Sequence, residues 1–199
     1  DEIFALFHNA PSDISGVHEL VGNLAKDISH ILPKKIDSVL HLAQSNFYRD
    51  PVNHGEDIVD INTVSTFNLL NWAKKAGAQK FIFSSTANVY ESTSEILTES
   101  SLVKPMSLYA ASKACAEMFV DQFSGDFHTS ILRVFTVYGP MGRPDMSLFK
   151  FTKNISEGKK IDLYNNGDHV RDFTYIDDVI DSIVKLLNKN SKKSIPYQV

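Results

Sequence analysis

Short apolar runs along the chain alternate with longer segments in which hydrophobic side chains recur at helical spacing. The short runs predict β-strands over residues 1–7, 36–43, 80–85 and 128–135. The longer amphipathic segments predict helices over residues 57–77, 107–123 and 176–190, the first ended by Gly77 as a C-cap. Continuous apolar strands that alternate with helices indicate a parallel sheet covered on both faces. The sequence therefore predicts a doubly wound α/β domain.

The composition restricts the classes of function. With 199 residues and 43% hydrophobic content, the chain suffices for one domain with a core. A net charge of −4 with scattered basic residues disfavours nucleic acid as a partner. The single cysteine, Cys115, excludes a disulfide framework, and the seven histidines lack metal-ligand spacing, so no metal site is expected. No apolar run reaches membrane-spanning length, and we expect a soluble cytoplasmic protein without a membrane partner.

The residues that directly follow the predicted strands are the first candidates for chemistry, because parallel sheets bind ligands at the carboxyl ends of their strands. Thr86 follows the strand at 80–85, and the next helix carries Tyr109 and Lys113 within "YAASK". Positions four apart share a helix face, so Tyr109 and Lys113 can point at one spot. An isolated Y-x-x-x-K is more often a surface tyrosine beside a solvated lysine. Here the Thr86 hydroxyl at a strand end comes first, followed by Tyr109 and Lys113 on the next helix. In this order the three residues predict a Ser/Thr–Tyr–Lys catalytic constellation.

Several short motifs occur along the chain in a fixed order. They are "HLA" (41–43), "DINTVSTFNLL" (60–70), "FIFSSTANVY" (81–90), "YAASK" (109–113), "LRVFTVYGP" (132–140) and "RDFTYIDD" (171–178). In this order they resemble the extended short-chain dehydrogenase/reductase family of NAD-dependent nucleotide-sugar epimerases and dehydratases. The segment 135–179, which contains "GPMGRPDM", is most similar to UDP-glucuronate 4-epimerases.

The resemblance implies a division of the chain. Residues 1–140 would form a Rossmann-like NAD-binding domain, residues 141–170 would begin a small C-terminal substrate-binding lobe, and residues 171–199 would return to the first domain as a helix and a strand. Family members commonly pair through a helix bundle that would include residues 57–77 and 107–123. A homodimer is therefore expected.

The resemblance also implies a reaction. The expected activity is NAD-dependent 4-epimerisation that interconverts UDP-glucuronate and UDP-galacturonate through a 4-keto intermediate. Two alternatives remain open: a 4-epimerase of UDP-glucose or UDP-N-acetylglucosamine, and a catalytically inactive Rossmann-like binding module.

In the implied mechanism Tyr109 removes the proton of the sugar 4-hydroxyl group. Free tyrosine has a pKa near ~10, and a neighbouring ammonium together with the positive nicotinamide ring would lower it. Lys113 would supply that ammonium and hold the nicotinamide ribose, while Thr86 would hold the reacting oxygen. Arg143 would face the C6 carboxylate of the substrate.

The remaining candidates are also carried over by resemblance. The implied cofactor-binding residues are Asn23, Leu24, Leu42, Ala43, Gln44, Asn62, Ser84, Tyr109 and Lys113. The implied substrate-binding residues are Thr86, Ala87, Thr136, Arg143 and Arg171. Structural alternatives stay open for three of them: a solvent-facing Asn62, an Arg143–Asp145 pair and an Arg171–Asp172 pair.

The sequence departs from the family pattern at two places. No glycine-rich turn follows the first strand, and the chain starts at what would be the second strand of the fold. We therefore expect a fragment with an unpaired interior sheet edge and weak NAD binding. His8, near the usual position of an acidic ribose-binding residue, can face either the adenosine or solvent. At the second place, Ala87 and Asn88 replace the Asp and Glu of nucleotide-sugar 4,6-dehydratases, so dehydration is not expected.

Overall fold

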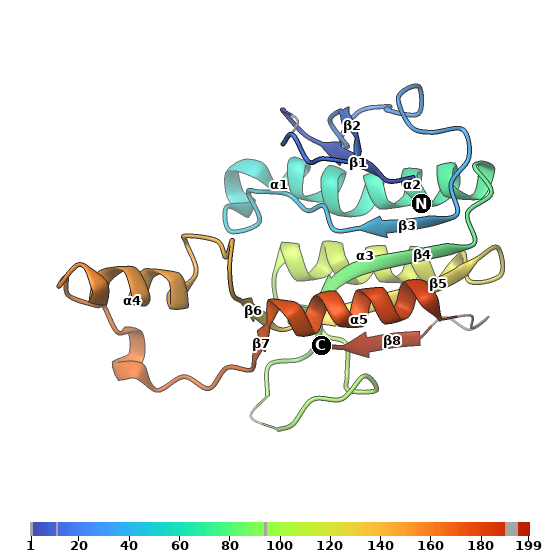
Figure 1. The fold of residues 1–199 in the computed structure, drawn as a ribbon. Helices are drawn as coiled ribbons and strands as arrows, with labels where there is room; N and C mark the ends of the chain where they lie inside the picture. Colours follow the sequence, from blue (N-terminus) through green and yellow to red (C-terminus); the bar gives the residue numbers. More distant parts are fainter. Residues whose placement is uncertain (1, 11, 94, 190–194) are drawn as a thin grey trace.

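Parallel strands in three groups form the framework of the computed structural model, which describes residues 2–10, 12–93, 95–189 and 195–199 (Figure 1). One sheet has the strand order β3–β4–β5–β8, with β3 (Ser38–His41), β4 (Lys80–Thr86), β5 (His128–Val134) and β8 (Ile195–Gln198). Two further pairs are β1 (Phe4–Phe7) with β2 (His18–Val21), and β6 (Thr136–Tyr138) with β7 (Phe173–Tyr175). All of these pairings are parallel.

Helices lie on both faces of the four-stranded sheet, as Figure 1 shows. The longer helical elements are α1 (Pro51–Val59), the π-helical η1 (Asp60–Val64), α2 (Ser65–Lys75), α3 (Leu108–Gln122), α4 (Ser147–Ser156) and α5 (Ile176–Asn188). Two short 3₁₀ turns, η2 (Ala87–Val89) and η3 (Tyr164–Gly167), complete the helical elements of the described chain. None of the helices in the described ranges is long and apolar enough to cross a membrane.

The alternation of side chains along β4 produces the two covered faces. Phe81 and Phe83 point to one face and pack with residues of α2 and α3, such as Leu70 and Val120. Ile82, between them, points to the other face and packs with Leu186 of α5 and its neighbours. Successive strand residues face opposite sides, so a continuous apolar strand is stable only between two helical layers. The predicted α/β architecture with helices on both faces is confirmed.

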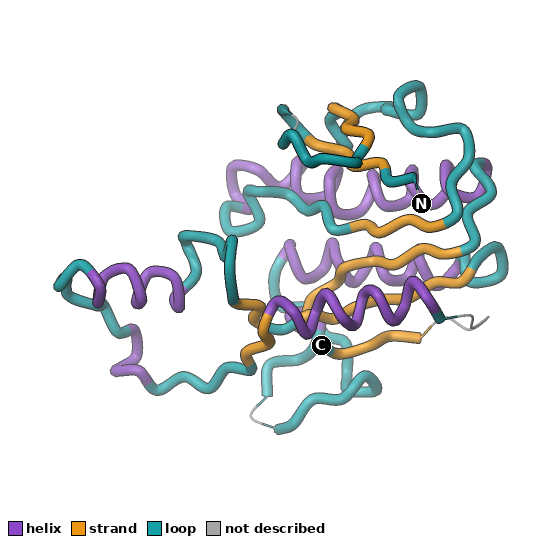
Figure 2. Tube along the Cα trace, viewed as in Figure 1, coloured by secondary structure: helices purple, strands orange, loops and turns teal. Residues whose placement is uncertain are grey.

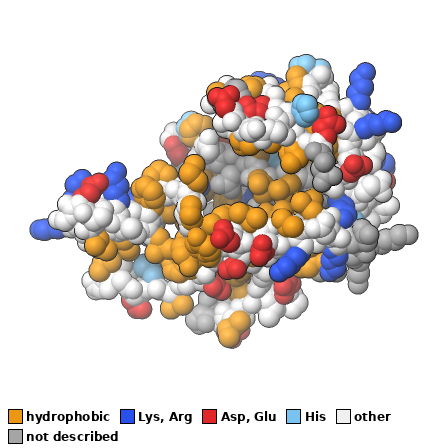
Figure 3. Space-filling model, in the orientation of Figure 1, with side chains coloured by type: hydrophobic (Ala, Val, Ile, Leu, Met, Phe, Trp, Pro, Cys, Tyr) orange, Lys and Arg blue, Asp and Glu red, His pale blue; other side chains and the backbone are white. Residues whose placement is uncertain are grey.

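The parallel strands do not all join one sheet in the described residues. Within the described residues, β1 pairs with β2 alone, and β3 is the edge strand of the four-stranded sheet. Figure 2 shows the β1–β2 pair as a separate unit above β3, and Figure 3 shows the surface hollowed between this unit and α5. In the described residues the parallel strands are therefore divided into separate groups, and β3 forms an edge of the four-stranded one.

The predicted strands at 80–85 and 128–135 agree within one residue with β4 and β5. The predicted helix 57–77 ends as expected, because Gly77 has φ +81° and its N–H bonds back to the Lys74 carbonyl. Its predicted start is wrong, since the helical segment begins at Pro51, where the Asp50 side chain accepts a hydrogen bond from the Asn53 N–H. The strands β2, β6 and β7 were not predicted, because three or four residues are too short to show a clear alternation.

Candidate functional site

Thr86 and Tyr109 lie together at the carboxyl end of β4. Thr86 is proposed to hold the reacting oxygen, and Tyr109 is the proposed base. The Ser107 side chain caps α3 by accepting a hydrogen bond from the Ala110 N–H, and this fixes where the first turn begins. Tyr109 in that turn is half-buried, and its hydroxyl donates a hydrogen bond to Gln44 Oε1 at 3.0 Å. Gln44 follows β3, so the tyrosine hydroxyl joins the ends of two neighbouring strands.

Several neighbouring groups shift the pKa of Tyr109 in opposite directions. Burial, the largest cause, raises this pKa above its ordinary value, and the Tyr48 hydroxyl raises it further. A hydrogen bond with Thr86 and the Arg143 guanidinium act in the opposite direction. The net result is a raised pKa. Lys113 is not one of the groups that shift this pKa in the described residues, so the lowering expected from its ammonium is not found, whereas the lowering expected from a bound nicotinamide ring stays a prediction. Desolvation outweighs the nearby positive charge.

Lys113 lies one turn further along α3 and is almost completely buried, with 2% of its surface exposed. Its ammonium lies 4.4 Å from the centroid of the Phe83 ring. Burial lowers the pKa of Lys113 to about 8, and the Glu117 carboxylate acts in the opposite direction. The lysine therefore remains mostly protonated near pH 7, under the helix turn that carries Tyr109.

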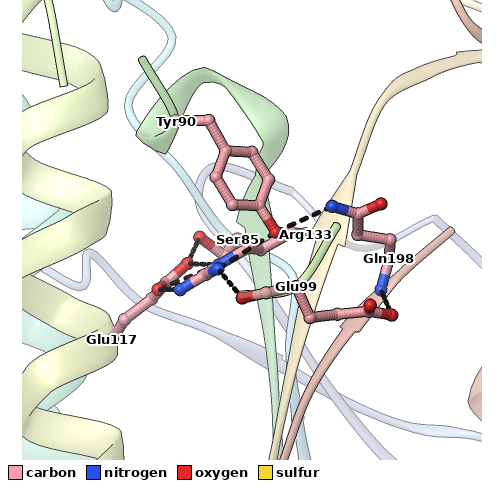
Figure 4. A network of polar contacts seen from close by, with 6 residues as sticks. All are labelled: Ser85, Tyr90, Glu99, Glu117, Arg133 and Gln198. Carbon is pink, nitrogen blue, oxygen red and sulfur yellow. Dashed lines mark hydrogen bonds and ion pairs between the residues drawn. The ribbon is translucent and has the colours of Figure 1, made fainter. Parts of the chain in front are cut away.

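Glu117, the next residue on this helix face, belongs to a buried polar network (Figure 4). Its carboxylate pairs with Arg133 of β5, which donates from Nη2 at 2.7 Å and from Nε at 3.1 Å. The hydroxyl of Ser85 in β4 donates to the same carboxylate. The network thus joins α3 to two strands of the sheet beneath the site.

The Nη1 donors of Arg133, on the side away from Glu117, also have hydrogen-bond partners. Arg133 Nη1 donates to the Tyr90 hydroxyl oxygen at 3.0 Å and to the Glu99 carbonyl at 3.1 Å. Gln198 of β8 donates to the same Tyr90 oxygen at 2.9 Å, so Figure 4 shows the arginine between α3 and β8. Every donor of such a buried guanidinium needs a partner. This network was not predicted from the sequence, although the position of Glu117 four residues after Lys113 is a usable signal.

Asn62 connects the loop after β3 with α3. It lies in the π-helical η1 and is completely buried. Its Oδ1 accepts a hydrogen bond from the Ser45 N–H at 2.8 Å, and its Nδ2 donates to Ser112 Oγ at 2.9 Å. A solvent-facing Asn62 is excluded by this burial. The side chain links the segment that carries Gln44 to the helix that carries Tyr109.

A cavity of about 140 Å³ lies where the ends of β1, β2 and β3 meet. Three residues implied in cofactor binding line it, namely Leu24, Ala43 and Gln44, and so does His8. Strand ends at this position are where open α/β sheets bind dinucleotides. Because Gln44 both lines the cavity and contacts Tyr109, the residues fit a ligand that reaches from the β1–β2 pair to the tyrosine.

The other six residues implied in cofactor binding, including Tyr109 and Lys113 described above, lie outside that lining. Asn23 accepts a hydrogen bond from the Ala25 N–H at 2.9 Å and stabilises its own turn. Leu42 is exposed, Ser84 is half-buried within β4, and Asn62 is completely buried. These residues do not line the strand-end cavity.

A second cavity, of about 430 Å³, lies between the end of β6 and α4. Thr136 and Arg143, both implied in substrate binding, line it. Ala87 and Arg171 do not, and the exposed Arg171 donates to the Val170 carbonyl at 2.7 Å. No Arg171–Asp172 ion pair is formed among the described residues.

Arg143 forms the pair that the sequence left open. Its Nη2 and Nε donate to the two carboxylate oxygens of Asp145 at 2.7 and 3.0 Å. Arg49 shares this carboxylate at 2.8 Å, and Arg143 also donates to the Tyr48 hydroxyl oxygen at 2.9 Å. Tyr48 and Arg49 were not predicted as site residues from the sequence, although they follow β3 closely.

Comparisons with known proteins agree with this geometry. A family model described as "NAD dependent epimerase/dehydratase family" matches residues 17–199. A UDP-glucuronate 4-epimerase of Thermodesulfobacterium geofontis is 41% identical over 151 residues, which cover 72% of this chain and 46% of that protein. The chain spans about half the length of the curated relatives it matches, for example 50% and 55% of two of them.

Solved structures give the same result. The UDP-glucuronic acid 4-epimerase from Bacillus cereus, in complex with UDP-glucuronic acid and NAD, is 30% identical with a TM-score of 0.84, covering 98% of this chain and 68% of that chain. MoeE5 in complex with UDP-glucuronic acid and NAD is 25% identical with a TM-score of 0.90, covering 100% and 68%.

Proposed function

The chain belongs to the NAD dependent epimerase/dehydratase family, and from this premise we propose that it acts as an NAD-dependent 4-epimerase of UDP-glucuronate. The observation that carries the proposal is the position of the Tyr109 hydroxyl, which contacts Gln44 at the end of β3 and Thr86 at the end of β4. A proton acceptor at the strand ends suits a reaction on a bound dinucleotide and sugar.

The residues that line the strand-end cavity would suit part of NAD, without the glycine-rich turn that usually binds its pyrophosphate. Leu24, Ala43 and Gln44 would hold NAD along the strand-end cavity, and Lys113 would meet the nicotinamide ribose. When bound, NAD would accept the hydride from C4 of the sugar and later return it. The Tyr109 oxygen would take the proton of the sugar 4-hydroxyl group. Thr86 would hold the sugar O4 atom by a hydrogen bond. When the 4-keto sugar is reduced on its other face, Tyr109 returns the proton.

Burial of Tyr109 has a consequence for this mechanism. The pKa of Tyr109 is raised in the structure. Its phenolate form therefore needs stabilisation by positive charge, from the bound cofactor and from Arg143. Proton removal is thereby coupled to occupancy of the site. A protonated Tyr109 would otherwise be the stable form at neutral pH.

The proposed substrate is a uronate because Arg143 lines the cleft next to Thr136. A guanidinium binds a carboxylate through two parallel hydrogen bonds, which a neutral hydroxymethyl group cannot match. The relatives named for UDP-glucuronate 4-epimerisation support the same choice. We assign residues 141–170, which include α4, to the substrate lobe, residues 1–140 to the NAD-binding domain, and residues 171–199 to elements that return to it.

Replacement of Tyr109 by Phe tests the proposed base. The substitution keeps the ring and removes the proton acceptor, so turnover of UDP-glucuronate should fall by ~10²–10⁴ with bound NAD unchanged. Tyr164→Phe is the matched control, since Tyr164 is 81% exposed on η3. Near-normal turnover in Tyr109→Phe would exclude this residue as the base.

Replacement of Arg143 by Ala tests the substrate class. The specificity constant for UDP-glucuronate should fall roughly 10- to 100-fold more than that for UDP-glucose, as expected for one lost charge-assisted contact. Equal losses on both sugars would remove the main support for a uronate.

We further propose a cytoplasmic homodimer that forms through α2 and α3. Phe67 on α2 and Met118 on α3 are large apolar side chains that are 44% and 62% exposed. Sedimentation of the purified protein at the mass of a monomer would contradict this assembly.

A further inference from the structure

Two arginines from distant parts of the chain meet at one carboxylate beside the proposed active site. Arg49 precedes α1, and Arg143 lies in the loop between β6 and α4. Arg49 Nη1 lies 2.8 Å and Arg143 Nη2 lies 2.7 Å from the same oxygen of Asp145. The second oxygen of Asp145 accepts from Arg143 Nε at 3.0 Å. The carboxylate is thus held in a two-arginine clamp.

Tyr48 supports the clamp and places it next to the base. The guanidinium carbons of Arg49 and Arg143 lie 5.1 and 4.9 Å from the centroid of the Tyr48 ring. The Tyr48 ring centroid in turn lies 5.2 Å from that of Tyr109. Cations are attracted to an aromatic face at such distances. One aromatic side chain therefore contacts both arginines and the proposed proton acceptor.

The clamp is open to solvent and borders the larger cleft. The side chains of Arg49, Arg143 and Asp145 are 56%, 47% and 35% exposed. Arg143 and Met146 line the 430 Å³ cleft, and Arg49 also contacts Met146, with Nη2 at 3.9 Å from the sulfur. An anionic group entering this cleft can reach the clamp without unfolding any element.

The charges of the clamp do not balance. Two guanidinium groups face one carboxylate, so a positive charge remains next to the Tyr109 ring. A guanidinium has five N–H donors, and Asp145 accepts from only two of those on Arg143. The arrangement has both the charge and the donors for a carboxylate other than Asp145.

We propose that Arg49 and Arg143 together bind the sugar carboxylate of the substrate, and that Asp145 is an internal carboxylate that this group replaces. The inference rests on the proposed function and adds Arg49 and Asp145 to it as residues that determine specificity. Asp145 keeps the two arginines aligned and competes with the ligand for them. A neutral hydroxymethyl group cannot displace it, because two charge-assisted hydrogen bonds would be lost without replacement.

The experiment measures binding of UDP-glucuronate and of UDP-glucose to the protein in excess NAD by calorimetry. Arg49→Gln should weaken UDP-glucuronate binding by about tenfold or more, as for a lost charge-assisted contact, and change UDP-glucose binding by less than about twofold. Asp145→Asn, which removes the competing charge, should strengthen UDP-glucuronate binding several-fold and leave UDP-glucose binding nearly unchanged. The matched control is Lys74→Gln, which breaks the exposed Lys74–Asp126 ion pair of 2.7 Å away from the site and should change neither affinity.

Two results would overturn the inference. Equal changes for both sugars in Arg49→Gln, or no change, would show that Arg49 does not bind the carboxylate. Weaker UDP-glucuronate binding in Asp145→Asn would show that Asp145 supports the ligand and does not compete with it. Failure of the wild-type protein to bind or turn over UDP-glucuronate would instead reject the proposed function, so the two failures are distinguishable. Arg49 is exposed, so its variant remains informative if Asp145→Asn does not fold.

Discussion

Two arginine–carboxylate pairs in this protein have the same geometry and opposite surroundings. Arg133 and Glu117 are 2.7 Å apart with side chains that are 8% and 7% exposed. Arg143 and Asp145 are also 2.7 Å apart, but their side chains are 47% and 35% exposed. The buried pair has further partners in Ser85, Tyr90 and the Glu99 carbonyl, whereas the exposed pair shares its carboxylate with a second arginine.

The difference shows how burial decides what such a pair does. Removing a charge from water costs several kcal/mol, so a buried pair is stable only when all its donors are satisfied and neither partner can leave. An exposed pair is screened by water and contributes little to stability, so its carboxylate can exchange. The Glu117–Arg133 pair therefore fixes α3 on the sheet, and the Asp145 clamp remains available to a ligand.

The largest expected difference between the two pairs is in the free energy of unfolding when the carboxylate is removed. Glu117→Ala leaves the Arg133 charge buried without its main partner and should lower the free energy of unfolding by roughly 3–5 kcal/mol. Asp145→Ala should lower it by no more than about 1 kcal/mol. Urea-induced unfolding measures both values. Similar losses in the two variants would show that burial is not what distinguishes the pairs.

The next effect uses Lys113, the buried cation one turn before Glu117. Its pKa is lowered to about 8 in the folded protein from an ordinary value of 10.5. Between these values the unfolded state binds more protons, so the free energy of unfolding should rise with pH across this window, by roughly 3 kcal/mol in total. Below about pH 8 the cost of burying the charge is fully present.

Lys113→Met is the control for this prediction. Met cannot titrate, so the rise above about pH 8 should disappear, while other groups that titrate there contribute equally to both proteins. Parallel pH profiles of wild type and Lys113→Met would contradict the lowered pKa. Glu117→Gln should begin the rise at lower pH, because the carboxylate that raises the pKa of Lys113 is then absent.

The smallest effect concerns the geometry of the guanidinium group. Lys cannot reproduce the fork with which Arg133 contacts Glu117 and Tyr90, so Arg133→Lys should cost about 1.5–3 kcal/mol, as for a hydrogen bond to a charged group. Arg143→Lys should change stability by less than about 0.5 kcal/mol, with that change screened further at 1 M salt. A salt-sensitive loss in Arg133→Lys would show that solvent reaches the network.

Much of the framework and the order of the proposed catalytic residues could be predicted from the sequence. Local periodicity determines that 80–85 is a strand and 107–123 a helix, and Gly77 marks a helix end by its conformation. The strand-end rule then places Thr86 near the helix that carries Tyr109 and Lys113. These inferences succeed because they depend on neighbours in the chain, whose spacing is visible in the sequence itself.

Tertiary structure alone decided the electrostatics of the site and the partners of its charges. Burial raises the pKa of Tyr109 and lowers that of Lys113, and burial depends on which segments pack over a side chain. The pairing of Arg49 and Arg143 with Asp145 joins the loop after β3 to the loop after β6, which no local pattern relates. The sequence determined which chemical groups the protein carries. Only the packing of distant elements determined which of them lie in water, which are buried and which meet.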